Sequence, residues 1–507
     1  MKNRTLYFGD NLEILRKKIP DETFDLIYLD PPFNSNRSYN VLFREGLQDS
    51  PAQVKAFEDS WHWNRESKST FDFLVRRTNE NIANLMQALE KVIGQNDMMA
   101  YLAMMTVRLI ELRRVLKSTG SIYLHCDPTA SHYLKIVLDA IFGKKNFRNE
   151  IVWSYNKWAV SQKMFSRNHD IVLFYCKDSE SLKFHTLLQP RAESTLKRFG
   201  MKKIVSAVDP KTGKRVPSQV ESDESEGVKM SDVWQIPILA PVSKERLGYP
   251  TQKPEALLER IIQASSKEGD LILDPFCGCG TTVAVAERFK RHWVGIDITA
   301  LAINLIKRRL KDQFELGSRQ IIVDGLPTDL TGARELFKKD PFEFEYWALD
   351  LVEAVPAQSK SKENMRGADK GIDGVIFFHK NLISNGNGNG NGKWEYGKIL
   401  VQVKGGGVQR RDIATLKGDV DRERADGGLF ITLEKPTKPM IQETVDSGEF
   451  TTPITGKMEF PKIQILTVEE LLNGKRPNLP QGLVKSYHKE AKYTEINNSN
   501  QSSLLSL

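Results

Sequence analysis

The sequence predicts an α/β fold in which a doubly wound sheet is followed by a second, smaller α/β domain. Short apolar runs alternate with segments of helical spacing over residues 1–177, which is typical of such a sheet. The chain has 507 residues, more than one hydrophobic core usually serves, so we expect two or three domains.

The apolar pattern also predicts the individual elements. Helical spacing over residues 101–116 predicts a helix, which we expect Gly120 to end. A second helix is expected to begin near Pro254, because proline suits the first helical turn. The expected strands cover residues 6–8, 24–29, 121–125, 271–273 and 293–296.

The alternating pattern stops at residue 178 and resumes at residue 246. We therefore expect residues 1–177 and 246–325 to form one domain, with residues 178–245 inserted in it. Residues 326–480 form the second domain, and its Asn-Gly repeat at 385–392 suits a flexible hairpin tip because it can bury nothing. We expect the Asn- and Ser-rich tail, 481–507, to be disordered.

The net charge of +8 and the sequence pI of about 9.0 suit a polyanionic partner. No apolar run approaches the roughly 18 residues that span a bilayer. Residues 1–4 lead into a strand without the apolar stretch of a signal peptide. With only four cysteines, a secreted disulfide framework is not expected. We therefore expect a cytoplasmic protein that does not bind membranes.

A glycine-rich loop follows the strand at 271–273 and opens a helix; it reads Asp-Pro-Phe-Cys-Gly-Cys-Gly-Thr-Thr over residues 274–282. Its glycines let a ligand approach the backbone, and the helix N-terminus offers N–H donors that suit a carboxylate or a phosphate. Asp297, at the end of the next strand, has the position of a carboxylate that holds ribose hydroxyls. Cys277 and Cys279 lie close together without a second pair, which makes a poor zinc set.

The tetrad Asp30-Pro31-Pro32-Phe33 directly follows the strand at 24–29. An exocyclic amine on a base is a poor nucleophile, because its lone pair is delocalised into the ring. A carboxylate and a backbone carbonyl that accept its hydrogens favour a more pyramidal nitrogen. Consecutive prolines stiffen the turn, and an aromatic ring can stack on a base swung out of the helix.

Together these motifs resemble the beta class of DNA amino-methyltransferases, in which the tetrad precedes the cofactor loop and a target-recognition segment lies between them. Residues 146–153, 167–170 and 249–254 also resemble that class. The resemblance covers nearly all of residues 4–310 apart from the insertion. It implies a Rossmann-like sheet and S-adenosylmethionine as the methyl donor.

The resemblance also implies roles for individual residues. Asp30, Pro31, Pro32 and Phe33 would be catalytic, Asp10 would lie near the adenine ring, and Asp297 would hold the ribose. Aspartate at the first tetrad position favours adenine N6, with cytosine N4 left open. The residues implied at the methionine end of the donor are Lys253, Asp274, Phe276, Gly278, Gly280 and Thr281.

The implied partner is double-stranded DNA, read by the insertion at 178–245 as the target-recognition region. Its cations could contact phosphates or guanine edges. Whether the protein forms a homodimer is left open. The cations in question are Arg191, Lys197, Arg198, Lys202 and Lys203.

The second domain contains Asp373 before one expected strand, and Gln402 and Lys404 on another. A period of two puts Gln402 and Lys404 on one face of the strand. The segment resembles a PD-(D/E)xK restriction-endonuclease-like domain of the Mrr type, with glutamine in place of the acid. This implies Mg²⁺ held by Asp373 and Gln402, with Lys404 catalytic. Glu345, in a helix expected over residues 344–354, would be the upstream acid.

We therefore expect a DNA methyltransferase fused to a restriction endonuclease, as in restriction–modification. One alternative is a solitary methyltransferase whose second domain only binds DNA. Metal-dependent cutting of DNA would distinguish the fused endonuclease from this alternative. Another is methylation of RNA or of a protein amide, since related tetrads occur in such enzymes.

Overall fold

A computed structural model provides the structure of the chain. It describes residues 1–32, 37–45, 48–59, 62–157, 163, 165–205, 212–214, 219–224, 227–240, 243, 245–247, 249, 251–317, 319–357, 371–383, 393–456 and 458–480. Phe33, the Asn-Gly repeat and the tail from residue 481 lie outside these ranges, so the predictions made for them stay predictions.

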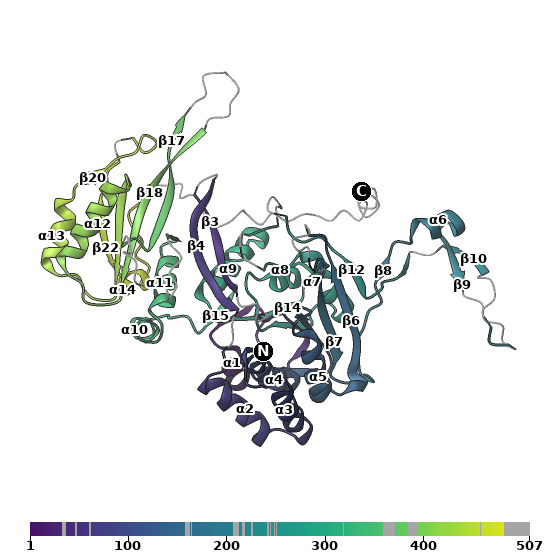
Figure 1. The fold of residues 1–507 in the computed structure, drawn as a ribbon. Coiled ribbons are helices and arrows are strands. Elements are labelled where there is room, and N and C mark those ends of the chain that lie inside the picture. The colour runs from purple at the N-terminus through teal and green to yellow at the C-terminus, as the bar shows by residue number, and fades with distance from the viewer. Residues whose placement is uncertain are drawn as a thin grey trace.

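A nine-stranded sheet forms the first part of the molecule, in the order β12-β6-β7-β5-β2-β13-β14-β1-β15 (Figure 1). Strands β5, β2, β13, β14, β1 and β15 are mutually parallel, whereas β7 runs antiparallel to β5 and β6. The bounds are β1 Thr5–Phe8, β2 Phe24–Leu29, β5 Leu116–Cys126, β6 Phe147–Ser154, β7 His169–Cys176, β12 Val233–Gln235, β13 Leu271–Asp274, β14 His292–Asp297 and β15 Ile322–Asp324.

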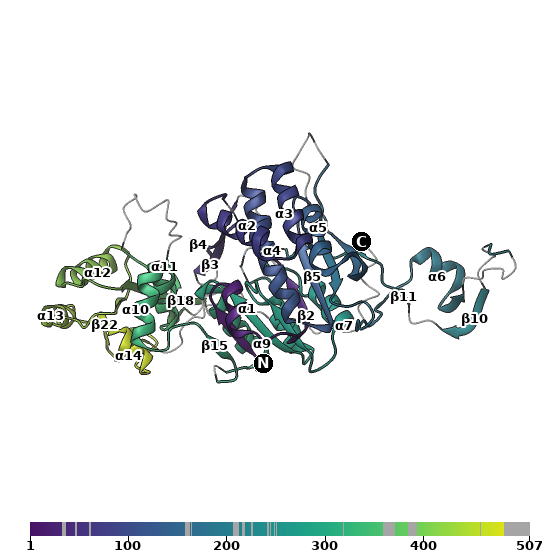
Figure 2. The same cartoon turned by 90° about the horizontal axis from the view of Figure 1, so that it is seen from below.

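Helices cover both faces of this sheet, which confirms the doubly wound architecture. One face packs on α1 (Asn11–Lys18), α2 (Arg65–Arg77), α3 (Glu80–Ile93), α4 (Asp97–Val115) and α5 (Ser131–Phe142). The other face packs on α7 (Glu255–Ser265), α8 (Thr281–Arg288) and α9 (Ala300–Phe314). Figure 2 shows α2, α3, α4 and α5 grouped on their side of the sheet. A hairpin of β3 (Arg37–Glu45) and β4 (Gln48–Asp59) and a short turn, η1 (Lys144–Asn146), complete this part.

The prediction that Gly120 ends the helix before it is wrong. Helix α4 ends at Val115, and Gly120 lies inside strand β5. A Cβ added at Gly120 would come within 2.6 Å of Leu116 Cδ1 and 3.0 Å of the Asp25 carbonyl oxygen. Close packing, and not helix termination, therefore explains this glycine.

The predicted insertion contributes a strand to the main sheet, because β12 pairs in parallel with β6. The rest of residues 178–245 forms small elements: β8 (Leu188–Gln189), α6 (Glu193–Phe199), β9 (Lys202–Val205), β10 (Gln219–Glu224) and β11 (Val228–Lys229). In both views α6 and β10 stand away from the sheet, at the opposite end of the molecule from α12 and α13 (Figures 1 and 2).

A five-stranded sheet forms the second part, in the order β16-β17-β18-β19-β22. Strands β17 and β18 are antiparallel and flank the Asn-Gly repeat, whereas β18, β19 and β22 are parallel. Its strands are β16 (Val355–Pro356), β17 (Gly374–Ile383), β18 (Lys393–Lys404), β19 (Gly427–Thr432) and β22 (Ile463–Thr467), with β20 (Glu449–Phe450) and β21 (Phe460–Pro461) as a separate pair. Its helices are α10 (Leu330–Lys339), α11 (Pro341–Asp350), α12 (Arg410–Arg422), α13 (Lys438–Asp446) and α14 (Val468–Leu472).

Helix α11 starts earlier than predicted, since Asp340 caps its first turn and Pro341 occupies the first helical position. It connects the two parts of the chain: Glu343 Oε2 accepts a 2.9 Å hydrogen bond from the backbone N–H of Ala300, the first residue of α9. Among the described residues, no helix is long and apolar enough to cross a membrane.

Candidate active sites

Four aspartates gather where neighbouring parallel strands of the large sheet end. Asp10 follows β1, Asp30 follows β2, and Asp274 and Asp297 are the last residues of β13 and β14. These four strands are consecutive in the sheet. The described part of the tetrad, residues 30–32, and the glycine-rich loop are remote in sequence but meet at the carboxyl ends of the strands, where ligands bind in open α/β sheets.

Asp30 is held from one side by Lys253. The Lys253 ammonium donates a 2.7 Å hydrogen bond to Asp30 Oδ2, and both side chains are largely buried. The other carboxylate oxygen, Oδ1, is buried and accepts no hydrogen bond from the described residues. Pro31 is buried beside it, Pro32 is half-buried, and Phe33 lies outside the described ranges.

A buried histidine that we did not predict as a site residue lies next to Asp30. His125 Nδ1 is 3.8 Å from Asp30 Oδ1 and 2.9 Å from the Tyr28 hydroxyl. Its Nε2 is 3.3 Å from Asp170 Oδ2, and Asp170 Oδ1 accepts a 3.1 Å hydrogen bond from Tyr155. Burial raises the pKa of Asp170, but His125, Lys253 and Tyr155 outweigh it and hold that pKa below its usual value.

Asp274 anchors the glycine-rich loop from inside. Its Oδ1 accepts the Phe276 N–H at 3.1 Å, and its Oδ2 accepts the Thr282 hydroxyl at 2.5 Å. Burial, with smaller contributions from Asp30 and Asp297, raises the pKa of Asp274 to about 7. Near neutral pH this carboxyl is therefore poised between its charged and neutral forms.

Asp297 and Asp10 both bind protein groups in this structure. Asp297 Oδ2 accepts the Gly278 N–H at 2.9 Å, and Oδ1 accepts the Thr299 N–H and hydroxyl. Burial raises the pKa of Asp297, and these hydrogen bonds oppose the rise. Asp10 caps helix α1 and pairs with Arg108 at 2.7 Å. Both aspartates thus fix the backbone at the carboxyl ends of β1 and β14.

The loop residues lie at the start of α8. Gly278 and Gly280 have φ of +47° and +73°, which only glycine adopts without strain. The Tyr249 ring would lie 3.3 Å from a Cβ at Gly278. Phe276 is half-buried, and the hydroxyl of Thr281 lies 3.3 Å from the guanidinium of the fully buried Arg309.

Cys277 and Cys279 are both buried, and burial raises the pKa of each thiol. Thiolates bind metals, so neutral thiols suit packing better than metal binding. Among the residues that the structure describes, no group of three or more His, Cys, Asp or Glu side chains is placed so that it could hold a metal ion.

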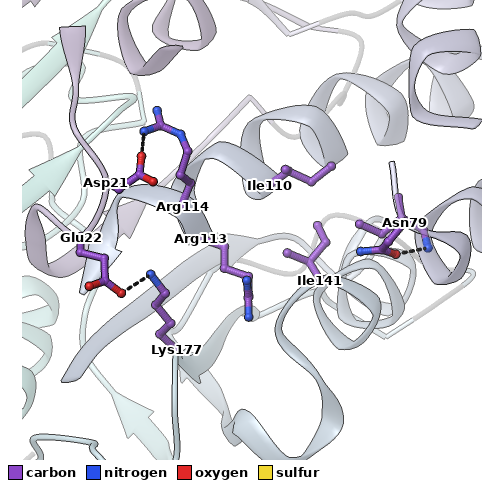
Figure 3. A pocket seen from close by; sticks show the side chains of 9 residues that line it. Asp21, Glu22, Asn79, Ile110, Arg113, Arg114, Ile141 and Lys177 are labelled. Carbon is purple, nitrogen blue, oxygen red and sulfur yellow. Dashed lines mark hydrogen bonds and ion pairs between the residues drawn. The ribbon is translucent and has the colours of Figure 1, made fainter. Parts of the chain in front are cut away.

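A surface hollow lies at the other end of the parallel strands, near their amino ends (Figure 3). Asp21 and Glu22 precede β2, and Arg113 and Arg114 precede β5, so these residues surround the amino ends of the strands. Arg114 is paired with Asp21, and Lys177 with Glu22 at 3.2 Å. This hollow is separate from the aspartate cluster.

In the second domain the period-two prediction is confirmed. Val401 packs in the core that contains α11, whereas Leu400 packs in the core that contains α12. Gln402 and Lys404 therefore lie on the α12 side of β18. The Asp373 N–H donates to Val401 O at 2.9 Å, and Asp373 Oδ2 accepts the Val403 N–H at 2.7 Å, which places Asp373 across from Gln402.

Helix α12 adds two carboxylates that the sequence analysis missed. Asp412 pairs with Lys404 at 2.7 Å, and Asp419 Oδ2 and Gln402 Oε1 are both buried without a hydrogen bond from the described part of the chain. Both aspartates are seven residues apart, a spacing that places them on one helix face and could have marked them. Glu345, expected as an upstream acid, lies on α11, which packs on the opposite face of the sheet.

One expectation for the insertion is wrong. Arg191 was expected to face DNA, but it is buried, and its guanidinium donates to the carbonyl oxygens of Gly200 and Lys202 at 2.9 and 2.7 Å. Lys197, Arg198 and Lys202 are exposed, and the side chain of Lys203 is outside the described residues.

Comparison with known proteins identifies both parts of the chain. A family described as DNA methylase matches residues 24–308, more than half of the sequence. The chain belongs to this DNA methylase family. A second family, described as restriction endonuclease, matches residues 336–454. The protein is therefore a DNA methyltransferase with a restriction endonuclease domain at its carboxyl-terminal side.

Curated relatives cover mainly the methylase domain. The DNA adenine methyltransferase YhdJ of Escherichia coli K12 is 29% identical over 311 residues, which are 61% of this chain and 82% of that protein. Type II methyltransferase M.HpaI of Haemophilus parainfluenzae is 27% identical over 300 residues, 59% of this chain and 71% of the relative. A solved putative DNA modification methylase of Thermus thermophilus, TTHA0409, is 17% identical with a TM-score of 0.35, and the match covers 64% of this chain and 99% of that one.

Proposed function

We propose that the methylase domain transfers a methyl group from S-adenosylmethionine to the exocyclic amine of a base swung out of double-stranded DNA, with adenine N6 as the preferred target. The observation that carries the proposal is the juxtaposition of Asp30 with the Asp274 loop at adjacent strand ends. The adenine specificity in the name of the Escherichia coli relative favours adenine.

The crevice fits such a donor by its chemistry. Lys253 is a cation for the donor carboxylate, and the N-terminus of α8 supplies N–H donors beside two glycines whose bare backbone admits a ligand. Asp274 and Asp297 provide carboxylates for the ammonium and ribose groups. The bound donor would supply an electrophilic methyl group.

The residues of the chain would prepare the nucleophile. Asp30 Oδ1, which is buried without a described hydrogen-bond partner, can accept an amine hydrogen, and a carbonyl of the Pro31-Pro32 turn can accept the other. These hydrogen bonds draw the nitrogen lone pair out of conjugation with the ring. Phe33 would stack on the extruded base. Burial of Asp30 keeps water away from these hydrogen bonds and strengthens them.

For the second domain we propose Mg²⁺-dependent cleavage of DNA. Asp373 and Gln402 offer the hard oxygen ligands that Mg²⁺ prefers, and the buried Oε1 of Gln402, which accepts no hydrogen bond among the described residues, fits a ligand role. Bound metal would polarise the phosphodiester, and Lys404 would orient or deprotonate the attacking water. Both activities need DNA, so we propose that the protein acts in the cytoplasm. It would act there as a monomer or as a homodimer.

The test is product analysis with donor labelled in the methyl group. Purified protein is incubated with DNA, RNA or an acceptor protein, and the labelled product is digested and identified. We expect label in DNA as N6-methyladenine. Label as N4-methylcytosine would overturn the base assignment, and label in RNA or protein alone would overturn the proposed substrate.

A further inference from the structure

Methylation of an amine releases a proton, and the structure offers a buried acceptor for it. The nitrogen–carbon bond forms as the bond from the methyl group to the donor sulfur breaks, and its electron pair stays on sulfur. One N–H bond of the amine also breaks, and its electrons stay on nitrogen. The released proton must leave a crevice lined by buried side chains.

The hydrogen bonds of His125 fix which of its nitrogens can accept a proton. Asp170 is ionised at neutral pH, because its pKa is lowered, and it can only accept from His125 Nε2 at 3.3 Å. Nε2 therefore carries the hydrogen of the neutral ring, and Nδ1 carries the lone pair. Tyr28 donates to this lone pair at 2.9 Å.

Nδ1 and Asp30 Oδ1 thus face each other as two acceptors. They are 3.8 Å apart, His125 is fully buried, and Asp30 Oδ1 has no hydrogen-bond partner within the described ranges. Nδ1 already accepts from the Tyr28 hydroxyl, whereas Asp30 Oδ1 is buried without a described partner. Burying an unpaired acceptor is unfavourable, so Asp30 Oδ1 is complementary to one additional proton.

We propose that His125 takes up the proton released by the amine, through Asp30, and that Asp170 stabilises the resulting imidazolium. This inference rests on the proposed role of Asp30. The proton first binds Asp30 Oδ1 and then moves to His125 Nδ1 as the Tyr28 hydroxyl turns its hydrogen away from that nitrogen, which leaves Asp30 ionised again. In the receiving state the ring lies between two carboxylates, each of which favours its charged form.

The hydrogen bonds of Asp170 continue toward the surface. Asp170 Oδ1 is hydrogen-bonded to the Tyr155 hydroxyl at 3.1 Å, and Tyr155 accepts from the exposed Lys157 at 3.3 Å. Within the described ranges, the charged and titratable groups seen to contact His125 are Tyr28 and Asp30 at the end of β2 and Asp170 from β7. Lys253 contacts Asp30, and Tyr155 contacts Asp170.

The test measures single-turnover methyl transfer between about pH 5.5 and 9, at saturating donor so that titration of Asp274 does not enter through donor binding. The wild-type rate should rise with pH, because a proton acceptor works only in its unprotonated form. His125→Gln should lose this rise and react about 100-fold more slowly at high pH, with donor affinity within about twofold. His132→Gln, an exposed histidine on α5, is the matched control and should behave as wild type.

Asp170→Asn provides an independent measurement if His125→Gln folds poorly. Loss of the neighbouring carboxylate should move the midpoint of the rise in rate to lower pH, because the imidazolium loses its partner. A merely structural role predicts no such shift. Retention of the wild-type rate and profile by His125→Gln, or an unmoved midpoint in Asp170→Asn, would overturn the proposal.

Asp30→Ala separates the two hypotheses. An inactive Asp30→Ala together with a fully active His125→Gln would overturn the proton path alone. An active Asp30→Ala would overturn the proposed function on which the path rests.

Discussion

Lys253 Nζ lies 2.7 Å from Asp30 Oδ2, so a residue expected to hold the donor holds the proposed catalytic carboxylate in this structure. The Lys253 side chain is 10% exposed, and the Asp30 side chain is 17% exposed. A donor carboxylate that binds Lys253 would compete with Asp30 for the same ammonium. Donor binding would then loosen Asp30 for contact with the base amine.

The first prediction concerns this ion pair. Lys253→Gln should weaken donor binding at least about tenfold and lower stability by about 3 kcal/mol, because it leaves a buried carboxylate without its cation. The double variant Lys253→Gln/Asp30→Asn should recover part of the stability. Calorimetry and thermal unfolding measure both effects. A double variant no more stable than Lys253→Gln would contradict a direct interaction.

The second prediction concerns the start of α8. Gly280→Ala should lower stability by about 2 kcal/mol, since its φ is +73° and the new Cβ would lie 2.7 Å from Ile306 Cγ1. Gly406→Ala is the control, because no described atom lies within 4 Å of a Cβ at that position. Equal urea midpoints for the two variants would show that the loop geometry is wrong.

The third prediction is a pH dependence that arises from Asp274. Its pKa is raised from 3.8 to about 7, so its contribution to stability is present at low pH and is lost as pH rises toward 7. The donor-free protein should therefore lose up to about 1.4 kcal/mol per pH unit from this group between those values. The stability of Asp274→Asn should lack this decline with pH, so the difference in unfolding free energy between wild type and Asp274→Asn should change with pH by that slope. Parallel pH profiles of the two proteins would argue against the raised pKa.

The fourth prediction tests the second domain. Lys404→Ala should abolish Mg²⁺-dependent cleavage, and Gln402→Glu should bind Mg²⁺ more tightly because a carboxylate replaces a neutral oxygen ligand. Lys435→Ala, an exposed lysine beyond β19, is the control and should cut as wild type. Equal cleavage by wild type and Lys404→Ala would point to contamination or a different site.

The sequence predicted that Asp30 lies close to the Asp274 loop, because both follow apolar strands of one parallel sheet. The carboxyl ends of neighbouring parallel strands lie side by side. The loop glycines were predicted from the local sequence, whereas the role of Lys253 was implied by the resemblance to the beta class of DNA amino-methyltransferases and stays a prediction. These features depend on local sequence and on one general rule about α/β sheets.

The contacts of His125 could not be predicted in this manner. Asp170 reaches His125 because β7 runs antiparallel to β5, so Asp170, the second residue of β7, lies beside the end of β5. The pairing of Lys404 with Asp412 similarly depends on how α12 crosses β18. Arg191 was misassigned because charge alone does not distinguish a solvent-facing guanidinium from one that binds buried carbonyl oxygens.

The most direct test of the account compares wild type with Asp30→Ala in transfer of a labelled methyl group to DNA, with donor affinity measured on the same preparations. The account predicts that Asp30→Ala binds the donor nearly as tightly as wild type and transfers no label. Undiminished incorporation of label by Asp30→Ala would contradict it.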